Sequence, residues 1–318
     1  MKKIIAAAVI CSMFGIVPVF AAVDYPRRAV TINTSKSGSM VDYVARAFAK
    51  SANKYFGANL VVNSTSGQIA AVRETGKANP DGYTVGIVNN TVVINDVMGS
   101  TDFDSIKDVD IIATLGDNVS SWIAIKKDLA DKGNIRTLSD LFAYSKAHPG
   151  DLIISDRTAS NTNTVVLQLM KAGLDVTPAD VGTSTDRLTN FLSDNCQIFV
   201  GSYGLISQYI EKGDVVCLAS CSAERSSFSP DVPCTSELGY EVACPATYYV
   251  FAPNGMPSEV KVALEAVCDK AVSDPGFVKD LANNTIEAKY RNTMGANKYL
   301  TDLKQSMIDL GMGVGYQR

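Results

Sequence analysis

The chain has 318 residues, of which 46% are hydrophobic and 19% are charged. This length suits two folded lobes of about 100 to 150 residues each, and the apolar content excludes a disordered chain. The formal net charge of −4 argues against nucleic acid or an anionic membrane surface as the partner.

The N-terminus has the pattern of a secretory signal peptide. Two lysines precede an apolar run from Ile4 to Phe20, which ends in small residues. A membrane anchor is disfavoured because this run spans only about 17 residues and contains Gly15 and Pro18. We therefore expect residues 1–21 to be cleaved and the mature chain to be a soluble periplasmic protein.

From Arg28 onward, short β-branched runs alternate with amphipathic stretches. This alternation is typical of parallel sheets covered by helices. In the first half of the chain it predicts strands at 30–32, 60–62 and 83–88, and helices at 40–55 and 69–77.

The second half continues the same pattern after residues 122–125 leave the first lobe. Thr137 is the expected N-cap of a helix that ends near His148. Further strands are predicted at 152–154, 197–200 and 215–219, helices at 163–172 and 184–193, a return crossing at 248–251, and a mostly helical stretch at 258–310.

Together these elements predict an α/β fold of two lobes, each a sheet flanked by helices, with a ligand cleft between them. The first lobe is expected to comprise residues 22–122 and 246–318, and the second residues 123–245.

Cysteine usage is unusual, because the six cysteines that remain after removal of Cys11 all lie in the C-terminal half. They are Cys196, Cys217, Cys221, Cys234, Cys244 and Cys268. In an oxidising compartment such an even number predicts up to three disulfides, whose connectivity the sequence leaves open. Cys234 with Cys244 is the preferred pair, since it would close a short loop. Zinc is disfavoured because Cys217 and Cys221 have no matching second pair, so neither a metal nor another cofactor is expected.

A series of short sequence motifs is spread along almost the whole mature chain. They are residues 25–30, 42–46, 80–84, 108, 148–150, 229–233, 238–242 and 251–253. In this order and at these separations the chain resembles the solute receptors of the tripartite tricarboxylate transporter family. The resemblance implies a monomeric periplasmic binding protein of type II-like fold. It also implies that the clamp closes over a small organic acid and delivers it to membrane permease subunits.

A buried carboxylate needs several hydrogen-bond donors, which loops at strand ends and helix N-termini supply. Three polar stretches have this character: residues 35–40, 155–163 and 182–185. Family members usually carry a glycine-rich run at the first and Tyr-Lys-Gly at the third, so this chain departs from the pattern at both. Arg157 is the expected partner of a second carboxylate, because its planar fork binds bidentately.

The predicted ligand-binding residues lie in these stretches and at the ends of the neighbouring strands. They are Ser37, Gly38, Ser39, Met40, Asp42, Ser66, Gly67, Asn89, Arg157, Ser160, Asn161, Thr162, Thr183, Ser184, Ser202, Tyr203 and Tyr248. The class of solute stays open between a dicarboxylate, a tricarboxylate, an aromatic acid and an amide.

The sequence also allows two functions other than a transport receptor. A hydrolase is disfavoured because the chain has no Gly-x-Ser-x-Gly elbow and its single histidine, His148, sits in a Pro-Gly turn. A periplasmic sensor or adaptor that uses the same clamp is the alternative, and sequence does not separate it from transport.

Overall fold

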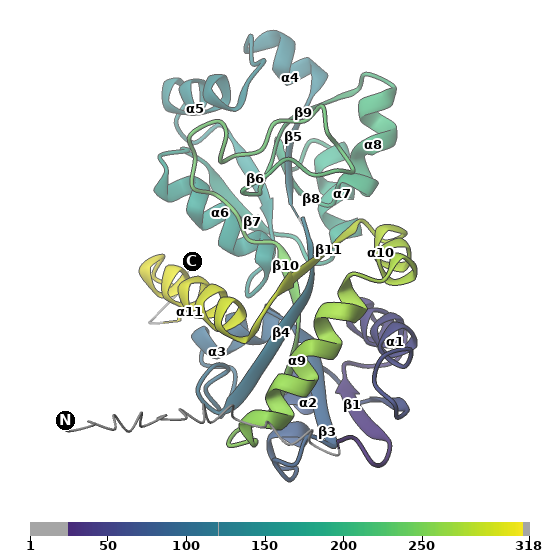
Figure 1. The fold of residues 1–318 in the computed structure, drawn as a ribbon. Coiled ribbons are helices and arrows are strands. Elements are labelled where there is room, and N and C mark those ends of the chain that lie inside the picture. Colours follow the sequence, from purple (N-terminus) through teal and green to yellow (C-terminus); the bar gives the residue numbers. More distant parts are fainter. Residues whose placement is uncertain (1–24, 120, 314–318) are drawn as a thin grey trace, which may run out of the picture.

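The computed structural model describes residues 25–119 and 121–313, which form two lobes stacked end to end (Figure 1). The predicted signal peptide lies outside the described residues. No helix among the described residues has both the length and the apolar character needed to span a membrane.

The first lobe is built on a six-stranded sheet of order β11-β4-β10-β3-β1-β2. Its strands are β1 (Val30–Thr34), β2 (Leu60–Ser64), β3 (Thr84–Asn89), β4 (Val109–Asn118), β10 (Ala246–Pro253) and β11 (Ile286–Arg291). Its helices are α1 (Met40–Ala52), α2 (Gln68–Gly76), α3 (Thr91–Val97), α9 (Ser258–Val272), α10 (Pro275–Ala282) and α11 (Thr293–Asp309).

The second lobe is built on a five-stranded sheet of order β7-β6-β8-β5-β9. Its strands are β5 (Trp122–Lys126), β6 (Ile153–Asp156), β7 (Thr177–Asp180), β8 (Ile198–Gly201) and β9 (Val215–Ser220). Its helices are α4 (Lys127–Lys132), α5 (Leu138–Ala147), α6 (Asn161–Lys171), α7 (Ser184–Leu192) and α8 (Tyr203–Glu211). The predicted α/β fold of two helix-flanked sheets is therefore confirmed.

Both sheets are mixed, whereas the sequence predicted parallel sheets. β1, β2 and β3 are parallel to one another, but β10 runs antiparallel to both β3 and β4. In the second sheet β5 runs antiparallel to both β8 and β9. The reason is topological: β5 and β10 each enter their lobe from the junction between the lobes, while their neighbours end there.

Three strands were not predicted: β7 in the second lobe, and β4 and β11 in the first. The buried run β4 links the first lobe to the second, and β11 interrupts the C-terminal stretch that was expected to be mostly helical. These two strands pair antiparallel with each other and form one side of the first sheet. β11 alternates apolar and polar residues, which is a strand pattern, but it stands between two helical stretches and was not separated from them.

The structure forms none of the predicted disulfides among the six cysteines, which all lie in its described part. Cys234 and Cys244, the preferred disulfide pair, contact different side chains. The Cys234 Sγ lies 3.5 Å from the Glu237 carboxylate, while the Cys244 Sγ lies 3.9 Å from the Asn90 side-chain nitrogen.

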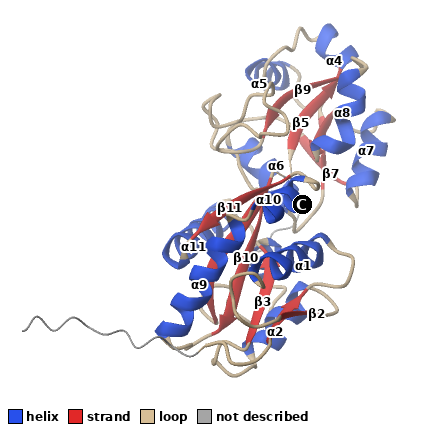
Figure 2. Cartoon of the chain, turned by 45° about the vertical axis from the view of Figure 1, so that its right-hand side comes forward, coloured by secondary structure: helices blue, strands red, loops and turns tan. Residues whose placement is uncertain are grey.

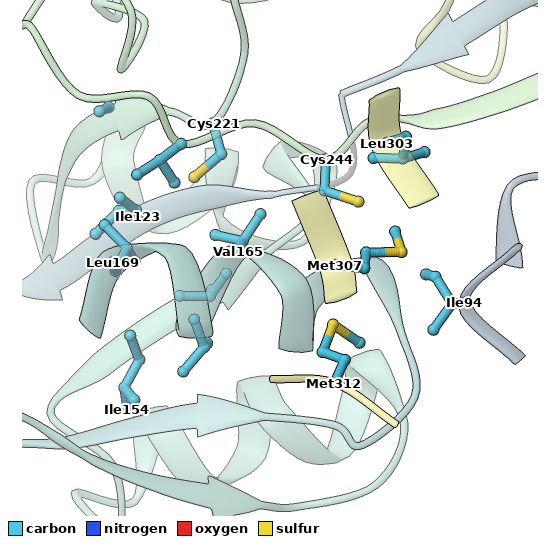
Figure 3. Close-up of a cluster of buried hydrophobic side chains, with 14 of the residues drawn as sticks. Ile94, Ile123, Ile154, Val165, Leu169, Cys221, Cys244, Leu303, Met307 and Met312 are labelled. Carbon is cyan, nitrogen blue, oxygen red and sulfur yellow. The ribbon is translucent and has the colours of Figure 1, made fainter. Parts of the chain in front are cut away.

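A hydrophobic cluster joins the two lobes (Figure 3). The second lobe contributes Val165 and Leu169 from α6, and the first lobe contributes Ile94 from α3 and Leu303 and Met307 from α11. All five side chains are buried in one continuous cluster. The lobes are thus held together by apolar packing as well as by the crossing segments.

The chain just beyond α11 extends this contact. Met312 is buried in the same cluster, and its sulfur lies 3.8 Å from the Thr164 hydroxyl of α6. Gly313 has a φ of 98°, and a Cβ there would lie 1.9 Å from the Val97 carbonyl of α3. Glycine is therefore required where the chain passes between α3 and α6.

Candidate functional site

The loops that follow β1 and β2 are tied together by the buried carboxylate of Asp42 on α1. It accepts hydrogen bonds from the Gly38 amide (3.1 Å), the Ser64 hydroxyl (2.7 Å) and Arg46 Nε (2.9 Å). Burial alone would raise the pKa of Asp42, but these hydrogen bonds outweigh it and hold the pKa below its ordinary value. Because its oxygens are engaged by protein donors, Asp42 shapes the loop.

The predicted residues of this loop lie on the rim of the first lobe. Ser37, Gly38 and Met40 are exposed, and Ser39 caps α1 by accepting a hydrogen bond from the Asp42 amide at 3.2 Å. Gly38 has a φ of 78°, which favours glycine.

The ends of β2 and β3 continue the same rim. Ser66 is exposed, while Gly67 and Gln68 are half-buried. Gln68 Oε1 accepts a hydrogen bond from the Asn89 amide at 2.7 Å, which ties the end of β3 to the start of α2. The three strand ends of the first lobe thus form one connected polar surface.

The second lobe has a matching loop between β6 and α6. The Ser160 hydroxyl caps α6 by accepting from the Asn163 amide at 3.2 Å, and it donates to the Arg157 carbonyl at 2.7 Å. Ala159 has a φ of 55°, a left-handed conformation that is costly for a residue other than glycine. Asn161 and Thr162 are buried, whereas Arg157 is exposed. This loop is therefore held in a fixed shape.

The two lobes meet through hydrogen bonds at Asn90, the residue that precedes α3. Its side-chain Oδ1 accepts a hydrogen bond from the Thr247 backbone N–H of β10 at 3.2 Å, and its Nδ2 donates to the Pro245 carbonyl at 3.0 Å. These two bonds fix which side-chain atom of Asn90 is the oxygen and which is the nitrogen. Asn161 of the second lobe then presents its Nδ2 to Asn90 Oδ1 at 3.4 Å.

This arrangement leaves an acceptor at the junction without a donor. Asn161 is 8% exposed, and its Oδ1 has no hydrogen-bond partner among the described residues. A buried polar atom without a partner costs about 1–3 kcal/mol, so this oxygen is a place where a water or a bound solute would gain a hydrogen bond.

The other predicted residues of the second lobe and of β10 differ in what they contact. Thr183 caps α7 in a capping box with Asp186, and Ser202 precedes α8. Tyr203 packs against Trp122 with ring centroids 5.6 Å apart. Tyr248 is 2% exposed and lies in the core of the first lobe, where burial raises its pKa and it is hydrogen-bonded to Asn89. Tyr248 therefore supports the end of β3 from the neighbouring strand β10, in which it pairs with Asn89.

Sequence reasoning missed the most unusual charged residue of the second lobe. Arg187 of α7 is 4% exposed, and its guanidinium donates to the carbonyls of Gly182 and Val200 and to the Ser184 hydroxyl. Burial lowers the pKa of Arg187, and the nearby charge of Arg157 lowers it further. A signal was present, since Arg187 stands four residues before the buried Phe191 and so shares its helix face.

A separate cavity of about 310 Å³ lies where the crossing segments meet α11 and β11. Asp117, Pro245, Arg291 and Tyr299 are among its lining residues, and it contains none of the predicted site residues. Its arginine is already paired, because Arg291 lies 2.7 Å from the Asp117 carboxylate and 4.3 Å above the Tyr299 ring.

The chemistry that this junction supports is binding. His148 stacks on Tyr144 at the end of α5, with ring centroids 4.1 Å apart, and precedes β6, whose other end carries the strand-end loop of the second lobe. In the part of the chain that the structure describes, no cluster of three or more His, Cys, Asp or Glu side chains is placed to hold a metal ion. Amide groups, hydroxyls and arginines are the groups that gather at the strand ends.

Comparison with known proteins agrees with this geometry. Residues 44–309 match the family model described as the tripartite tricarboxylate transporter family receptor, which confirms the resemblance seen in the sequence. A TctC solute-binding protein from Polaromonas, solved with no ligand, superposes with a TM-score of 0.80 at 19% identity, covering 90% of this chain and 98% of that one.

Two structures from Rhodopseudomonas palustris contain ligands. MatC with bound malate has a TM-score of 0.63 at 21% identity. A second protein, with adipate, has a TM-score of 0.66 at 17% identity. Each comparison covers 91% of this chain and 99% of the other, so the fold is shared over nearly its whole length.

Proposed function

Because this chain belongs to the tripartite tricarboxylate transporter receptor family, we propose that it captures a small organic acid between its lobes. The protein is then a periplasmic solute-binding receptor that hands the acid to the permease subunits of a secondary transporter. It performs no catalysis, and the lobes close over the solute by a hinge motion.

One observation carries this proposal: donor-rich strand ends of both lobes converge at the contact between Asn90 and Asn161. Helix α6 begins at this contact, and its N-terminus offers unpaired amides and partial positive charge. In the first lobe, the α1 N-terminus and the exposed hydroxyls of Ser37 and Ser66 follow the ends of β1 and β2. These groups are suited to replace the water around a carboxylate.

The solved relatives support the same class of solute, since malate and adipate are both small dicarboxylates. Among the predicted residues, the exposed Arg157 is suited to the carboxylate that lies nearer the second lobe. Asp42 is better suited to holding the loop of residues 35–40 in shape, because its oxygens already accept four protein hydrogen bonds.

We expect malate or adipate to raise the melting temperature of the mature, ligand-free protein in a saturable manner. A solute that binds only the folded chain stabilises it by RT ln(1 + [L]/Kd), which is about 2.7 kcal/mol at a hundredfold excess over Kd. The measurement is a thermal-shift titration, with malamide and adipamide as neutral controls. A shift with the diamides and none with any carboxylate would contradict the proposal.

A further inference from the structure

A second set of hydrogen bonds joins the two lobes, between β11 of the first lobe and the segment that follows β9 in the second. One carboxylate oxygen of Glu287 accepts from the Ser227 backbone N–H at 2.9 Å, from the Ser227 hydroxyl at 3.0 Å and from the Ser226 hydroxyl at 3.4 Å. Beside them, the Lys289 ammonium lies 3.4 Å from the Glu224 carboxylate. We call the contact between Glu287 and residues 226–227 the latch.

Each half of the latch is fixed to its own lobe. Glu287 lies on β11, which pairs with β4, and its neighbour Ile286 is 1% exposed in the core of the first lobe. In the second lobe, the Ser229 hydroxyl accepts from Trp122 Nε1 of β5 at 3.1 Å, and the Ser229 amide donates to the Ser226 carbonyl at 3.1 Å. A rotation of one lobe against the other therefore changes the distances across the latch.

The latch and the polar strand-end loops lie on opposite sides of the crossing segments. In the first sheet, β4 and β10 stand between β11 and the strands β3, β1 and β2 (Figure 2). In the second sheet, β5 stands between β9, which leads into the latch, and β8, β6 and β7, which lead into polar loops. A rotation about the crossing segments that brings the polar loops together therefore moves the two halves of the latch apart.

The hydrogen bonds on the two sides differ in length. Asn161 Nδ2 lies 3.4 Å from Asn90 Oδ1 on the side of the polar loops, whereas the two bonds from Ser227 to Glu287 are 2.9 and 3.0 Å long. Hydrogen bonds of this kind are most favourable near 2.9–3.0 Å. In this structure the latch is thus fully formed, while the contact beside the polar loops is longer than its optimum.

Two cavities meet at the latch. The cavity of about 310 Å³ that contains Arg291 and Tyr299 is also lined by Glu287. A second cavity, of about 480 Å³, is lined by Ser227, Glu287 and Tyr290 among others. The latch is therefore not part of a closely packed interface, and the lobes have room to turn against each other once its hydrogen bonds break.

We propose that the latch holds the lobes in an open arrangement and thereby weakens the apparent affinity for the solute. This inference rests on the proposed function, because closure over a solute is the motion that breaks the latch. When a fraction f of the molecules is in the closed, binding-competent arrangement, the apparent Kd is the intrinsic Kd divided by f. The latch stabilises the open arrangement and keeps f small.

The test is calorimetric titration of malate and adipate into the parent chain and into Glu287→Ala. We expect E287A to bind the acids at least about threefold more tightly, because the open arrangement loses hydrogen bonds that the closed arrangement does not make. The direction is diagnostic. A side chain that only stabilises the fold would, on removal, lower the melting temperature and leave Kd unchanged or raise it.

Two further variants control for the change in charge. Ser227→Ala keeps every charge and removes one hydroxyl donor of the latch, so it should tighten binding by a smaller factor than E287A. Glu259→Ala removes the same negative charge as E287A at an exposed position of α9, and it should leave Kd unchanged. Equal tightening in E259A and E287A would show a general effect of charge on an anionic solute and would contradict the latch.

Small-angle scattering of the ligand-free proteins tests the latch without a solute. E287A should have a smaller radius of gyration than the parent, and E259A should match the parent. If the parent binds the acids and E287A binds them no more tightly, the inference is wrong. If the parent binds neither acid, the proposed function fails for these solutes, and scattering alone decides: compaction of E287A supports the latch, and an unchanged radius of gyration contradicts it.

Discussion

Replacing Asn90 with alanine is expected to lower the free energy of unfolding by about 2–3 kcal/mol and to weaken solute binding. Asn90 is fully buried and satisfies the Thr247 amide and the Pro245 carbonyl, so N90A leaves two backbone groups without partners. It also removes the contact to Asn161, through which the two lobes meet at the proposed site. Urea unfolding and calorimetry with malate or adipate measure the two effects.

Two variants separate the roles of Asn90. Asn161→Ala removes the contact between the lobes but keeps both backbone hydrogen bonds of Asn90, so we expect weaker binding with near-parent stability. Asn95→Ala on the same helix removes only a bond to the Thr91 carbonyl and should change neither property strongly. If N90A and N161A both bind as the parent does, the site does not lie at this junction.

The second large effect is expected from Met307→Ala, which should lower the free energy of unfolding by about 3 kcal/mol. Met307 is fully buried where α11 meets α3 and α6, so truncation leaves a cavity shared by both lobes (Figure 3). Methionine is flexible and polarisable, which suits a contact that must adapt when the lobes move. M307A should therefore also alter the equilibrium between open and closed lobes, measured by small-angle scattering with and without solute.

Met294→Ala is the matched control on the same helix. Met294 is 78% exposed, so its truncation should change stability by no more than about 0.5 kcal/mol. Equal losses in the two variants would show that α11 does not form a buried bridge between the lobes.

The alternation of strands and helices could be predicted from the sequence because each element carries its own apolar pattern. Thr137 is an example, since its side chain caps α5 as expected, and the structure adds that Asp140 completes a capping box. The direction of β5 and β10 could not be predicted in this way, because it depends on where the chain crosses between lobes (Figure 2). β11 was missed for a similar reason, since it is stabilised by pairing with β4, which is distant in sequence.

The candidate site was predicted as polar stretches, and the structure adds how they are connected. The roles of Ser160 and Thr183 as helix caps follow from local sequence, whereas the contact of Asn161 with Asn90 joins residues 71 positions apart. Arg187 was missed because a charged residue on a helix is ordinarily solvated. Only its spacing from Phe191 indicated that it faces inward.

Hydrogen exchange with and without malate or adipate tests the central claim most directly. We predict slower exchange of amides in both strand-end loops, residues 35–41 of the first lobe and 157–163 of the second, when the solute binds. The segment 285–299, which contributes to the separate cavity at Arg291 and Tyr299, should exchange at an unchanged rate. Protection confined to that cavity, or to the loop of one lobe alone, would contradict binding between the lobes.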